Sequence, residues 1–204
     1  MPQSDPLVFV IDDDDAVRDS ISWLISSVDL KVRTYSSAAE FLDQCGPGQA
    51  GCLITDIRMP EISGLELQDE LNRRGCDIPV IVITGHGDVQ TAVRAMKAGA
   101  FDFIEKPFND QVLLDLVNRA VASSVESLRE QIEQADVKAR IASLTPREKQ
   151  VLDLISVGDS NKNIAHQLEI SEKTVEAHRA KVMGKMKAKS LAALVKMVIS
   201  IDGD

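Results

Sequence analysis

A regular alternation of short apolar runs with longer amphipathic stretches occupies the first 122 residues and narrows the possible folds more than any other feature. Strands that alternate with helices predict βα units and a parallel sheet. The first, third and fourth runs are almost wholly apolar, as central strands covered on both faces are, whereas the second carries Lys31 and Arg33 and suits an edge. Five strands and five helices predict a doubly wound α/β domain with a ligand crevice at the carboxyl ends of the strands. The runs are Leu7–Ile11, Val32–Tyr35, Cys52–Thr55, Val80–Thr84 and Phe101–Ile104.

Local sequence predicts where several helices begin and end. Ser37 and Glu40 have the spacing of a capping box, which predicts the start of the second helix. Gly99 stands where a C-cap glycine would end the fourth helix. Thr145 and Glu148 form another capping box, with a proline at the first helical position, and predict the start of an all-helical tail. Three further helices are expected there, over about 160–168, 172–187 and 190–200.

The fifth helix is expected to continue into a linker, because no Gly or Pro occurs from Gln111 to Thr145 and apolar residues recur at spacings of three or four. The alternative is a flexible acidic tether. The chain is therefore divided into an α/β domain over 1–122, a helical linker over 123–142 and an all-helical domain over 143–204. The apolar stripe comprises Leu114, Val117, Val121, Val125, Leu128, Ile132, Ala135 and Ala139, and the polar outer face comprises Glu126, Arg129, Glu130, Glu133 and Lys138.

The charge of the chain is distributed unevenly. Residues 1–142 carry 13 Lys and Arg against 24 Asp and Glu, a net charge of −11, and residues 143–204 carry 10 against 8, a net charge of +2. Because nucleic-acid phosphates repel an acidic body, only the tail is suited to approach DNA or RNA.

Composition argues against several classes of protein. No stretch has the apolar length of a membrane span, and the N-terminus lacks the basic-then-apolar layout of a secretion signal, so no membrane partner and a cytoplasmic location are expected. Cys45, Cys52 and Cys76 are odd in number and form no C-x-x-C pair, which favours reduced thiols over a disulfide framework or a zinc site.

Polar residues with complementary chemistry follow the ends of the predicted strands. Asp12, Asp13, Asp14 and Asp15 follow the first strand, Asp56 ends the third, Thr84 ends the fourth and Lys106 follows the fifth. In a doubly wound sheet these positions share one rim, where clustered carboxylates require a cation such as Mg²⁺. Asp56, at the end of the middle strand, is placed to attack a phosphorus atom while Lys106 neutralises the developing charge and Thr84 bonds a phosphoryl oxygen.

Each of these features has an ordinary structural explanation when it is taken alone. An aspartate run is commonly the N-cap of a helix, and Asp14 or Asp15 is expected to cap the first helix. A Lys-Pro pair at a strand end is commonly a turn, and Thr84 alone would be a buried strand hydroxyl. The functional interpretation depends on all of them falling on strand ends in the required order.

The motifs V-I-D-D-D-D, T-D-I-R-M-P-E-I-S-G, V-I-V-I-T-G and F-D-F-I-E-K-P-F resemble the motif set of two-component receiver domains, over residues 5–122. The resemblance implies a flavodoxin-like strand order 2-1-3-4-5 and phosphorylation by a sensor histidine kinase. It makes Asp56 the phospho-acceptor, and Lys106 the partner of the phosphoryl group. Thr84 and Phe103 would be the switch pair, with Phe103 in place of the tyrosine of many relatives. The implied Mg²⁺ ligands are Asp13 directly, Asp12 through water, Asp56 and the backbone carbonyl of Arg58.

The tail motifs L-T-P-R-E-K-Q-V-L-D-L-I, N-I-A and I-S-E-K-T-V-E-A-H-R-A-K-V-M-G-K-M resemble the LuxR-type helix-turn-helix domain, over residues 143–200. With the receiver motifs they indicate the FixJ/NarL class of response regulators, and the likeness is greatest to members of the FixJ type. The resemblance implies promoter DNA as a partner, a homodimer when phosphorylated, control of nitrogen-fixation or low-oxygen genes, and RNA polymerase as a partner if the protein activates transcription, the expected direction.

The long tail helix has two faces that can be assigned from spacing. Val175, His178, Val182 and Met186 share the face expected to be buried, so His178 is interpreted as a packed or capping residue. The outward face is small. Glu176, Ala177 and Ala180 are expected to contact bases, and Lys173, Arg179 and Lys181 are expected to contact phosphates.

Two other functions are compatible with part of the sequence. A phosphatase of the haloacid-dehalogenase type also uses a strand-end Asp-x-Asp, which Asp12 and Asp14 provide, but it would leave Asp56 and the tail unexplained. A docking adaptor would leave the intact acidic pocket unexplained. The chain is therefore expected to regulate transcription and not to be an enzyme with a separate substrate, although it would assist its own phosphorylation and dephosphorylation.

Overall fold

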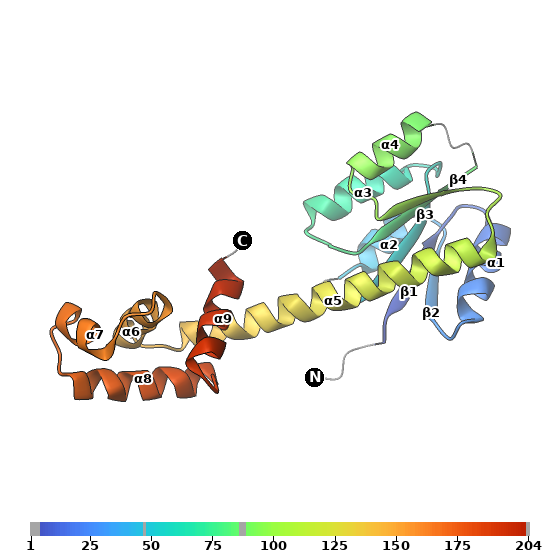
Figure 1. Ribbon diagram of the computed structural model, residues 1–204. Coiled ribbons are helices and arrows are strands. Elements are labelled where there is room, and N and C mark those ends of the chain that lie inside the picture. The colour runs from blue at the N-terminus through green and yellow to red at the C-terminus, as the bar shows by residue number, and fades with distance from the viewer. Residues whose placement is uncertain (1–4, 47, 86–88, 203–204) are drawn as a thin grey trace. The chain divides into compact units, whose positions relative to one another are not determined.

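The protein, seen here as a computed structural model, is described over residues 5–46, 48–85 and 89–202 and divides into two compact units, Met1–Arg129 and Glu130–Asp204 (Figure 1). The first four residues of the predicted receiver range and the last two of the predicted tail range lie outside the described residues. Across the described ranges, no helix is both long enough and apolar enough to cross a membrane.

The first unit contains a parallel sheet with the strand order β2-β1-β3-β4-β5, which confirms the predicted fold class and strand order. Strands β1, β3 and β4 are buried along nearly their whole length, and β2, which carries Lys31 and Arg33, lies at an edge and is largely exposed. The elements are β1 Leu7–Ile11, α1 Asp15–Ser26, β2 Lys31–Tyr35, α2 Ala38–Gln44, β3 Gly51–Asp56, α3 Gly64–Arg73, β4 Val80–Thr84, α4 Val89–Lys97, β5 Asp102–Glu105 and the first part of α5, which spans Asp110–Ala142.

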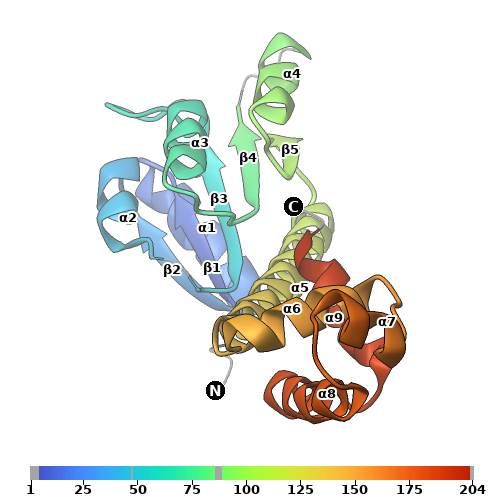
Figure 2. The same ribbon diagram turned by 90° about the vertical axis from the view of Figure 1, so that its left-hand side faces the viewer.

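Two separate hydrophobic cores cover the two faces of this sheet. Side chains of α2, α3 and α4 pack on one face, around Phe41, Leu67 and Ala95. Side chains of α1 and α5 pack on the other face, around Ile25 and Leu113. In Figure 2, α2 and α3 lie on one side of the strands and α5 on the other. Successive strand residues point to opposite faces, so each core receives every second residue of the central strands.

The predicted helix boundaries at Ser37 and Gly99 are confirmed. The Ser37 side chain accepts a hydrogen bond from the Glu40 N–H, although the Glu40 carboxylate bonds the Ser36 N–H at 3.2 Å in place of the Ser37 N–H. Gly99 follows α4 with a φ of +94°, a conformation that a residue without Cβ adopts readily, and its N–H donates to the Met96 carbonyl.

Helix α5 is continuous over 33 residues, as the pattern predicts, but its apolar stripe does not keep one role. Leu114, Val117 and Val121 are buried in the first unit. Ile132, Ala135 and Ala139, later in the predicted stripe, are exposed, and Val137 is buried in the second unit. Beyond residue 130 the helix therefore packs through a different face, which carries Val137, and leaves the later residues of the stripe exposed.

Ser124 lies on α5 just beyond the predicted receiver boundary, and its side chain forms a hydrogen bond with the start of β3. Its hydroxyl accepts a hydrogen bond of 3.1 Å from the N–H of Gly51, where β3 begins, and the side chain is only 7% exposed. Because a buried N–H without a partner is costly, this bond stabilises the start of the central strand.

Ser124→Ala is expected to lower the free energy of unfolding of the first unit by about 1–3 kcal/mol, because the buried Gly51 N–H would lose its acceptor. Urea denaturation followed by circular dichroism measures this loss. Ser123→Ala is the matched control, since Ser123 is exposed on the same helix. Equal denaturation midpoints for the two variants would contradict the prediction.

The second unit is all-helical, as predicted. It comprises the end of α5 with α6 Pro146–Ser156, α7 Asn161–Gln167, α8 Glu172–Met186 and α9 Leu191–Asp202 around one core. The capping box of Thr145 and Glu148 is complete, and the buried Glu148 carboxylate lies 2.6 Å from the Lys185 ammonium on α8. The hydrogen bond from Lys185, followed by the bond from the Thr145 N–H, lowers the pKa of Glu148 to about 2. The box therefore joins α6 to α8 as well as starting α6.

The end of α5 is part of this second unit. Val137 is buried in its core, and Ile141 packs against that core. Arg140 donates from Nη1 to the carbonyl of Met186 at the end of α8, at 2.9 Å. The compact unit thus begins at Glu130, well before the boundary at residue 143.

Candidate functional site

Two carboxylates and one ammonium converge at the carboxyl edge of the sheet. Asp12 directly follows β1 and Asp56 ends β3, and the paired register of Ile11 with Thr55 brings the two aspartates side by side. Lys106, in the loop after β5, places its Nζ 2.9 Å from Asp12 Oδ2 and 3.2 Å from Asp56 Oδ1. The structure therefore brings together three of the residues that strand-end position singles out.

The charges of this pocket do not balance. Burial acts against the charged form of Lys106, but the hydrogen bonds and charges of Asp12 and Asp56 outweigh it and raise the pKa of Lys106 above its usual value. One ammonium facing two carboxylates leaves an excess negative charge when both acids are ionised. Hard oxygen ligands with a residual negative charge are the donor set that suits a small divalent cation such as Mg²⁺.

The Asp56 carboxylate is held at both oxygens. Oδ1 faces Lys106, and Oδ2 accepts a hydrogen bond of 2.7 Å from the backbone N–H of Arg58. The Asp56 side chain remains partly accessible, whereas Asp12 is only 4% exposed. Asp56 is consequently both oriented and reachable, as a nucleophile must be.

The other residues of the aspartate run have different roles. Asp14 caps α1 by accepting from the Ala16 and Val17 N–H groups, which confirms the capping interpretation of the run. Asp13 is exposed, and within the described ranges no three His, Cys, Asp or Glu residues lie close enough together to hold a metal. The side chain of Asp13 is thus not gathered into the pocket with Asp12 and Asp56.

Thr84 and Phe103 lie on neighbouring strands and point to the same face of the sheet. Val82 pairs with Phe103 and Thr84 pairs with Glu105, so alternation along the strands directs Thr84 and Phe103 to the face that α4 covers. Thr84 is 2% exposed and Phe103 is half-buried. The carbonyl of Thr84 also accepts from the Lys106 N–H at 2.7 Å, which connects this pair to the pocket.

Two contributors to the pocket have no counterpart among the predicted site residues. Arg18 donates from Nη1 to the Asp12 carbonyl at 2.6 Å, and no local pattern marks it. Gly64 opens α3 beneath the acceptor strand, and a Cβ there would lie 2.4 Å from the Asp56 carbonyl oxygen. Gly64 could have been predicted from the sequence, because it is the last residue of the motif T-D-I-R-M-P-E-I-S-G.

Gly64→Ala is expected to destabilise the first unit by about 1–3 kcal/mol and to slow phosphorylation, because the new methyl group must displace the Asp56 backbone. Thermal unfolding and the rate of label incorporation from acetyl phosphate measure the two effects. Gly46→Ala is the control, since a Cβ at Gly46 meets no atom within 4 Å. An unchanged phosphorylation rate in Gly64→Ala would contradict the positioning role.

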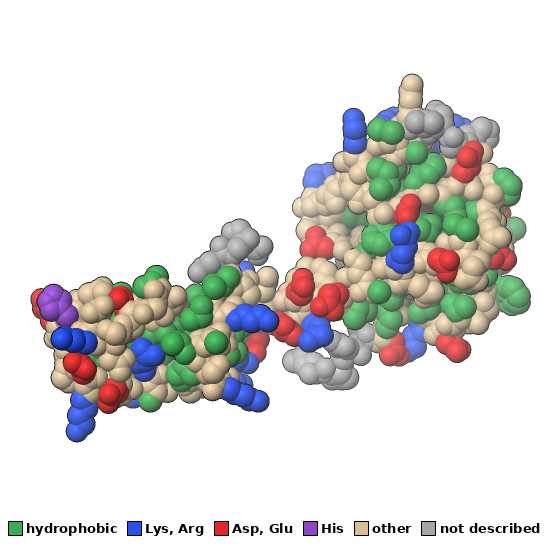
Figure 3. Space-filling model, viewed as in Figure 1, with side chains coloured by type: hydrophobic (Ala, Val, Ile, Leu, Met, Phe, Trp, Pro, Cys, Tyr) green, Lys and Arg blue, Asp and Glu red, His purple; other side chains and the backbone are tan. Residues whose placement is uncertain are grey.

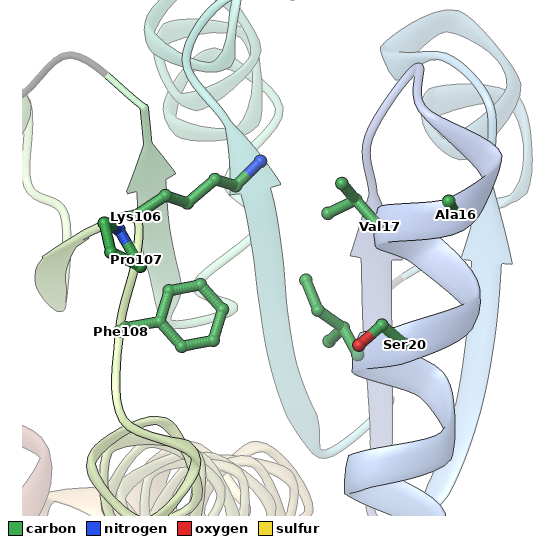
Figure 4. Close-up of a pocket in the computed structure, with 7 residues that line it drawn as sticks. Ala16, Val17, Ser20, Lys106, Pro107 and Phe108 are labelled. Carbon is green, nitrogen blue, oxygen red and sulfur yellow. The ribbon is translucent and has the colours of Figure 1, made fainter.

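A largely apolar hollow of about 360 Å³ adjoins the acidic pocket. Figure 4 shows the Phe108 ring facing Val17 and Ser20 of α1, with Lys106 extending from the same loop as Phe108. This hollow offers apolar contact area directly beside the charged groups.

Helix α8 presents most of the predicted DNA-contacting residues to solvent. Lys173, Glu176, Ala177, Ala180 and Lys181 are exposed, whereas Arg179 is half-buried. Figure 3 shows Lys and Arg side chains projecting from the edge of the second unit along which α8 runs in Figure 1. An exposed helix with small central residues and flanking cations has the composition of a helix that enters a DNA groove.

The opposite face of α8 is buried, as predicted, although one of its four residues is buried only in part. Val175, Val182 and Met186 are fully buried, and His178 is half-buried. The His178 Nδ1 is enclosed and has no hydrogen-bond partner in the second unit. His178 is therefore a packed residue, as predicted.

A strand-end pocket of two aspartates and a lysine, and an exposed helix with flanking cations, are the two features expected of a response regulator. Residues 8–118 match the response regulator receiver domain family, and residues 142–198 match the bacterial regulatory proteins of the luxR family. The chain belongs to the response regulators that combine a receiver domain with a LuxR-type DNA-binding domain.

Individual relatives match the sequence over nearly the whole chain. The protein is 53% identical to the transcriptional regulatory protein FixJ of Azorhizobium caulinodans, over 98% of this chain and 94% of that protein. It is 44% identical to the transcriptional regulatory protein TdiR of Thauera aromatica, over 94% of this chain and 85% of that protein. The low-resolution structure of the response regulator StyR matches with a TM-score of 0.88 and 43% identity, covering 96% of this chain and 99% of that one.

This membership decides between the alternatives that the sequence leaves open. The family consists of transcriptional regulators and not of enzymes such as phosphatases. A receiver domain implies a kinase as phosphodonor, and a LuxR-type domain implies DNA as a partner. Receiver domains generally bind Mg²⁺ at the phosphorylation site.

Proposed function

We propose that Asp56 accepts a phosphoryl group from a sensor histidine kinase and that this phosphorylation controls dimerisation and the binding of promoter DNA. The observation that carries the proposal is the convergence of Asp12, Asp56 and Lys106 at the carboxyl edge of the sheet. The proposed functional ranges are a receiver over 1–122, a helical linker over 123–142 and a DNA-binding domain over 143–204, working in the cytoplasm, where promoter DNA is found.

The chemistry follows from the held carboxylate. An oxygen of Asp56 attacks the phosphorus atom of the donor, and the bond from phosphorus to the donor's imidazole nitrogen breaks. Lys106 neutralises charge on the transferred oxygens, since its ammonium already lies within 3.2 Å of the acceptor. The Arg58 N–H keeps the acceptor oriented. The chain in this way assists its own phosphorylation without turning over a separate substrate.

Mg²⁺ is the proposed cofactor of this step. Asp12 and Asp56 provide oxygen donors with excess negative charge, and the family resemblance adds Asp13 and the backbone carbonyl of Arg58 as ligands. When bound, Mg²⁺ would supply further neutralisation of the phosphoryl oxygens.

The proposed switch is the Thr84 and Phe103 pair. A phosphoryl group on Asp56 would draw the Thr84 hydroxyl toward the pocket, and the half-buried Phe103 ring would fill the space that the hydroxyl leaves. Phenylalanine lacks the hydroxyl of tyrosine, so only the burial of the Phe103 ring would differ between the phosphorylated and unphosphorylated states. The changed surface, formed by α4, β5 and the first part of α5, is the proposed dimer interface.

Thr84→Ala is expected to accept phosphate at a rate close to that of the wild type but to remain monomeric, because no hydroxyl draws the ring inward. Sedimentation velocity after treatment with acetyl phosphate and Mg²⁺ measures this. Thr84→Ser keeps the hydroxyl and is expected to dimerise. If phosphorylated Thr84→Ala dimerises as the wild type does, the proposed coupling is wrong.

The tail is proposed to bind promoter DNA through α8. Glu176, Ala177 and Ala180 are the proposed base contacts, and Lys173, Arg179 and Lys181 the proposed phosphate contacts. Contact with RNA polymerase is proposed as the route to transcription activation. These assignments are supported by the exposure of five of the six side chains on one helix.

A further inference from the structure

Two of the three cysteines meet although 31 positions separate them in the sequence. The Sγ atoms of Cys45 and Cys76 lie 3.2 Å apart. Cys45 is the C-cap of α2, and its N–H donates to the Phe41 carbonyl at 2.8 Å. Cys76 follows α3, and its N–H donates to the Leu71 carbonyl at 3.0 Å. Both backbones are thus anchored to helix ends, which keeps the two sulfurs in contact.

The pair lies at the margin of the core, where a small solute can reach it. Both side chains are half-buried and pack against the core of α2 and α3, whereas Cys52 is 0% exposed within β3. Contact and access together are what conversion of two thiols into a disulfide requires.

We propose that Cys45 and Cys76 form a redox site, in which a peroxide converts the two thiols reversibly into a disulfide that joins the end of α2 to the segment after α3. This modification is separate from phosphorylation of Asp56 and adds a second covalent input to the receiver domain. It is compatible with reduced thiols in the resting protein, because disulfides inside the cytoplasm are commonly transient and redox-sensing.

The chemistry of the pair assigns different roles to the two sulfurs. The hydrogen bond with Cys45, in which either sulfur can donate, is the largest cause that lowers the pKa of Cys76, to about 6, helped by the Ile78 N–H and opposed by burial. The same interaction, together with burial, raises the pKa of Cys45. Because the Ile78 N–H also hydrogen-bonds to the Cys76 sulfur and stabilises a thiolate there, we assign Cys76 as the sulfur that attacks and Cys45 as the thiol that resolves.

The reaction balances with hydrogen peroxide as the oxidant. The Cys76 thiolate attacks one peroxide oxygen, the O–O bond breaks, and the departing hydroxide takes up a proton to give water and a sulfenic acid. Cys45 then attacks the Cys76 sulfur, the S–O bond breaks, and the hydroxide released takes the Cys45 proton. Two thiols and one peroxide yield one disulfide and two waters, and each sulfur loses one electron.

Cys52 supplies an internal comparison. Burial raises the pKa of its thiol to about 12, so it is protonated at neutral pH as well as inaccessible. A peroxide that reaches the folded chain is consequently expected to modify the Cys45 and Cys76 pair and to leave Cys52 intact.

The test treats the full reduced chain with a small excess of hydrogen peroxide, blocks remaining thiols with N-ethylmaleimide and measures mass and peptide linkage. The wild type is expected to lose about 2 Da before blocking, to yield a Cys45–Cys76 linked peptide and to recover on reduction with dithiothreitol. Cys52→Ser is expected to behave identically. Cys76→Ser is expected to react about tenfold more slowly, and Cys45→Ser is expected to stop at a dimedone-reactive sulfenic acid on Cys76.

Circular dichroism is used to check that each variant is folded. Counting of reactive thiols on the reduced wild type is an independent measurement, with two reactive thiols expected in the native protein and three after unfolding. A linked peptide that contains Cys52, sulfenic acid confined to Cys45, or no loss of mass in folded wild type would each overturn the proposal.

Discussion

Asp56→Asn is expected to lower incorporation of label from acetyl phosphate by at least about 100-fold, because an amide is a poor nucleophile and carries no charge for Lys106 to pair with. Asparagine has nearly the same shape as aspartate, so the fold should persist and the loss should report chemistry. The same loss is expected for the wild type when Mg²⁺ is removed by a chelator, since the paired carboxylates would then lack the proposed cation.

The control for this experiment is Asp69→Asn, which removes an exposed carboxylate on α3 outside the pocket and should leave labelling at the wild-type level. Stable label on Asp56→Asn at the wild-type level would move the acceptor to another residue. Full labelling of the wild type in the presence of chelator would remove Mg²⁺ from the proposal while leaving Asp56 in place.

The second large effect is expected in DNA binding. Full-length protein should bind DNA about tenfold or more tightly when it is phosphorylated, because a dimer presents two recognition helices at once. The compact unit Glu130–Asp204 should bind without phosphorylation, since it lacks residues 1–129, which carry 11 Lys and Arg against 21 Asp and Glu, a net charge of −10. A gel-shift titration at one fixed salt concentration, on DNA selected from a random pool by the phosphorylated protein, measures all samples.

A shorter fragment distinguishes the effect of removing the acidic residues from the effect of an incomplete core. Ser143–Asp204 also lacks the acidic body, but it loses Val137 from the core and the Arg140 bond to the Met186 carbonyl. It is therefore expected to be less stable than Glu130–Asp204 and to bind more weakly. Equal affinity of the full-length protein for DNA with and without phosphate would refute the expectation that the unphosphorylated first unit hinders DNA binding by the second. Equal stability of the two fragments would show that the end of α5 is dispensable.

The sequence by itself determined the architecture and the main members of the pocket. Alternating buried runs and amphipathic stretches predict a parallel sheet, and in such a sheet the carboxyl ends of all strands meet at one edge. Asp12, Asp56 and Lys106 therefore had to approach one another. Caps such as Ser37 and Thr145 were also predictable, because the chemistry of a cap lies within four consecutive residues.

Only the tertiary structure decided contacts between segments that are distant in sequence. Helical periodicity identifies an apolar stripe but not its partner, so it favoured Ile132 where packing in the second unit selects Val137. The same limit applies to the Cys45 and Cys76 contact and to Gly64 against the Asp56 carbonyl. These contacts depend on how helices settle on the sheet, and side-chain volume and backbone approach decide that packing in three dimensions.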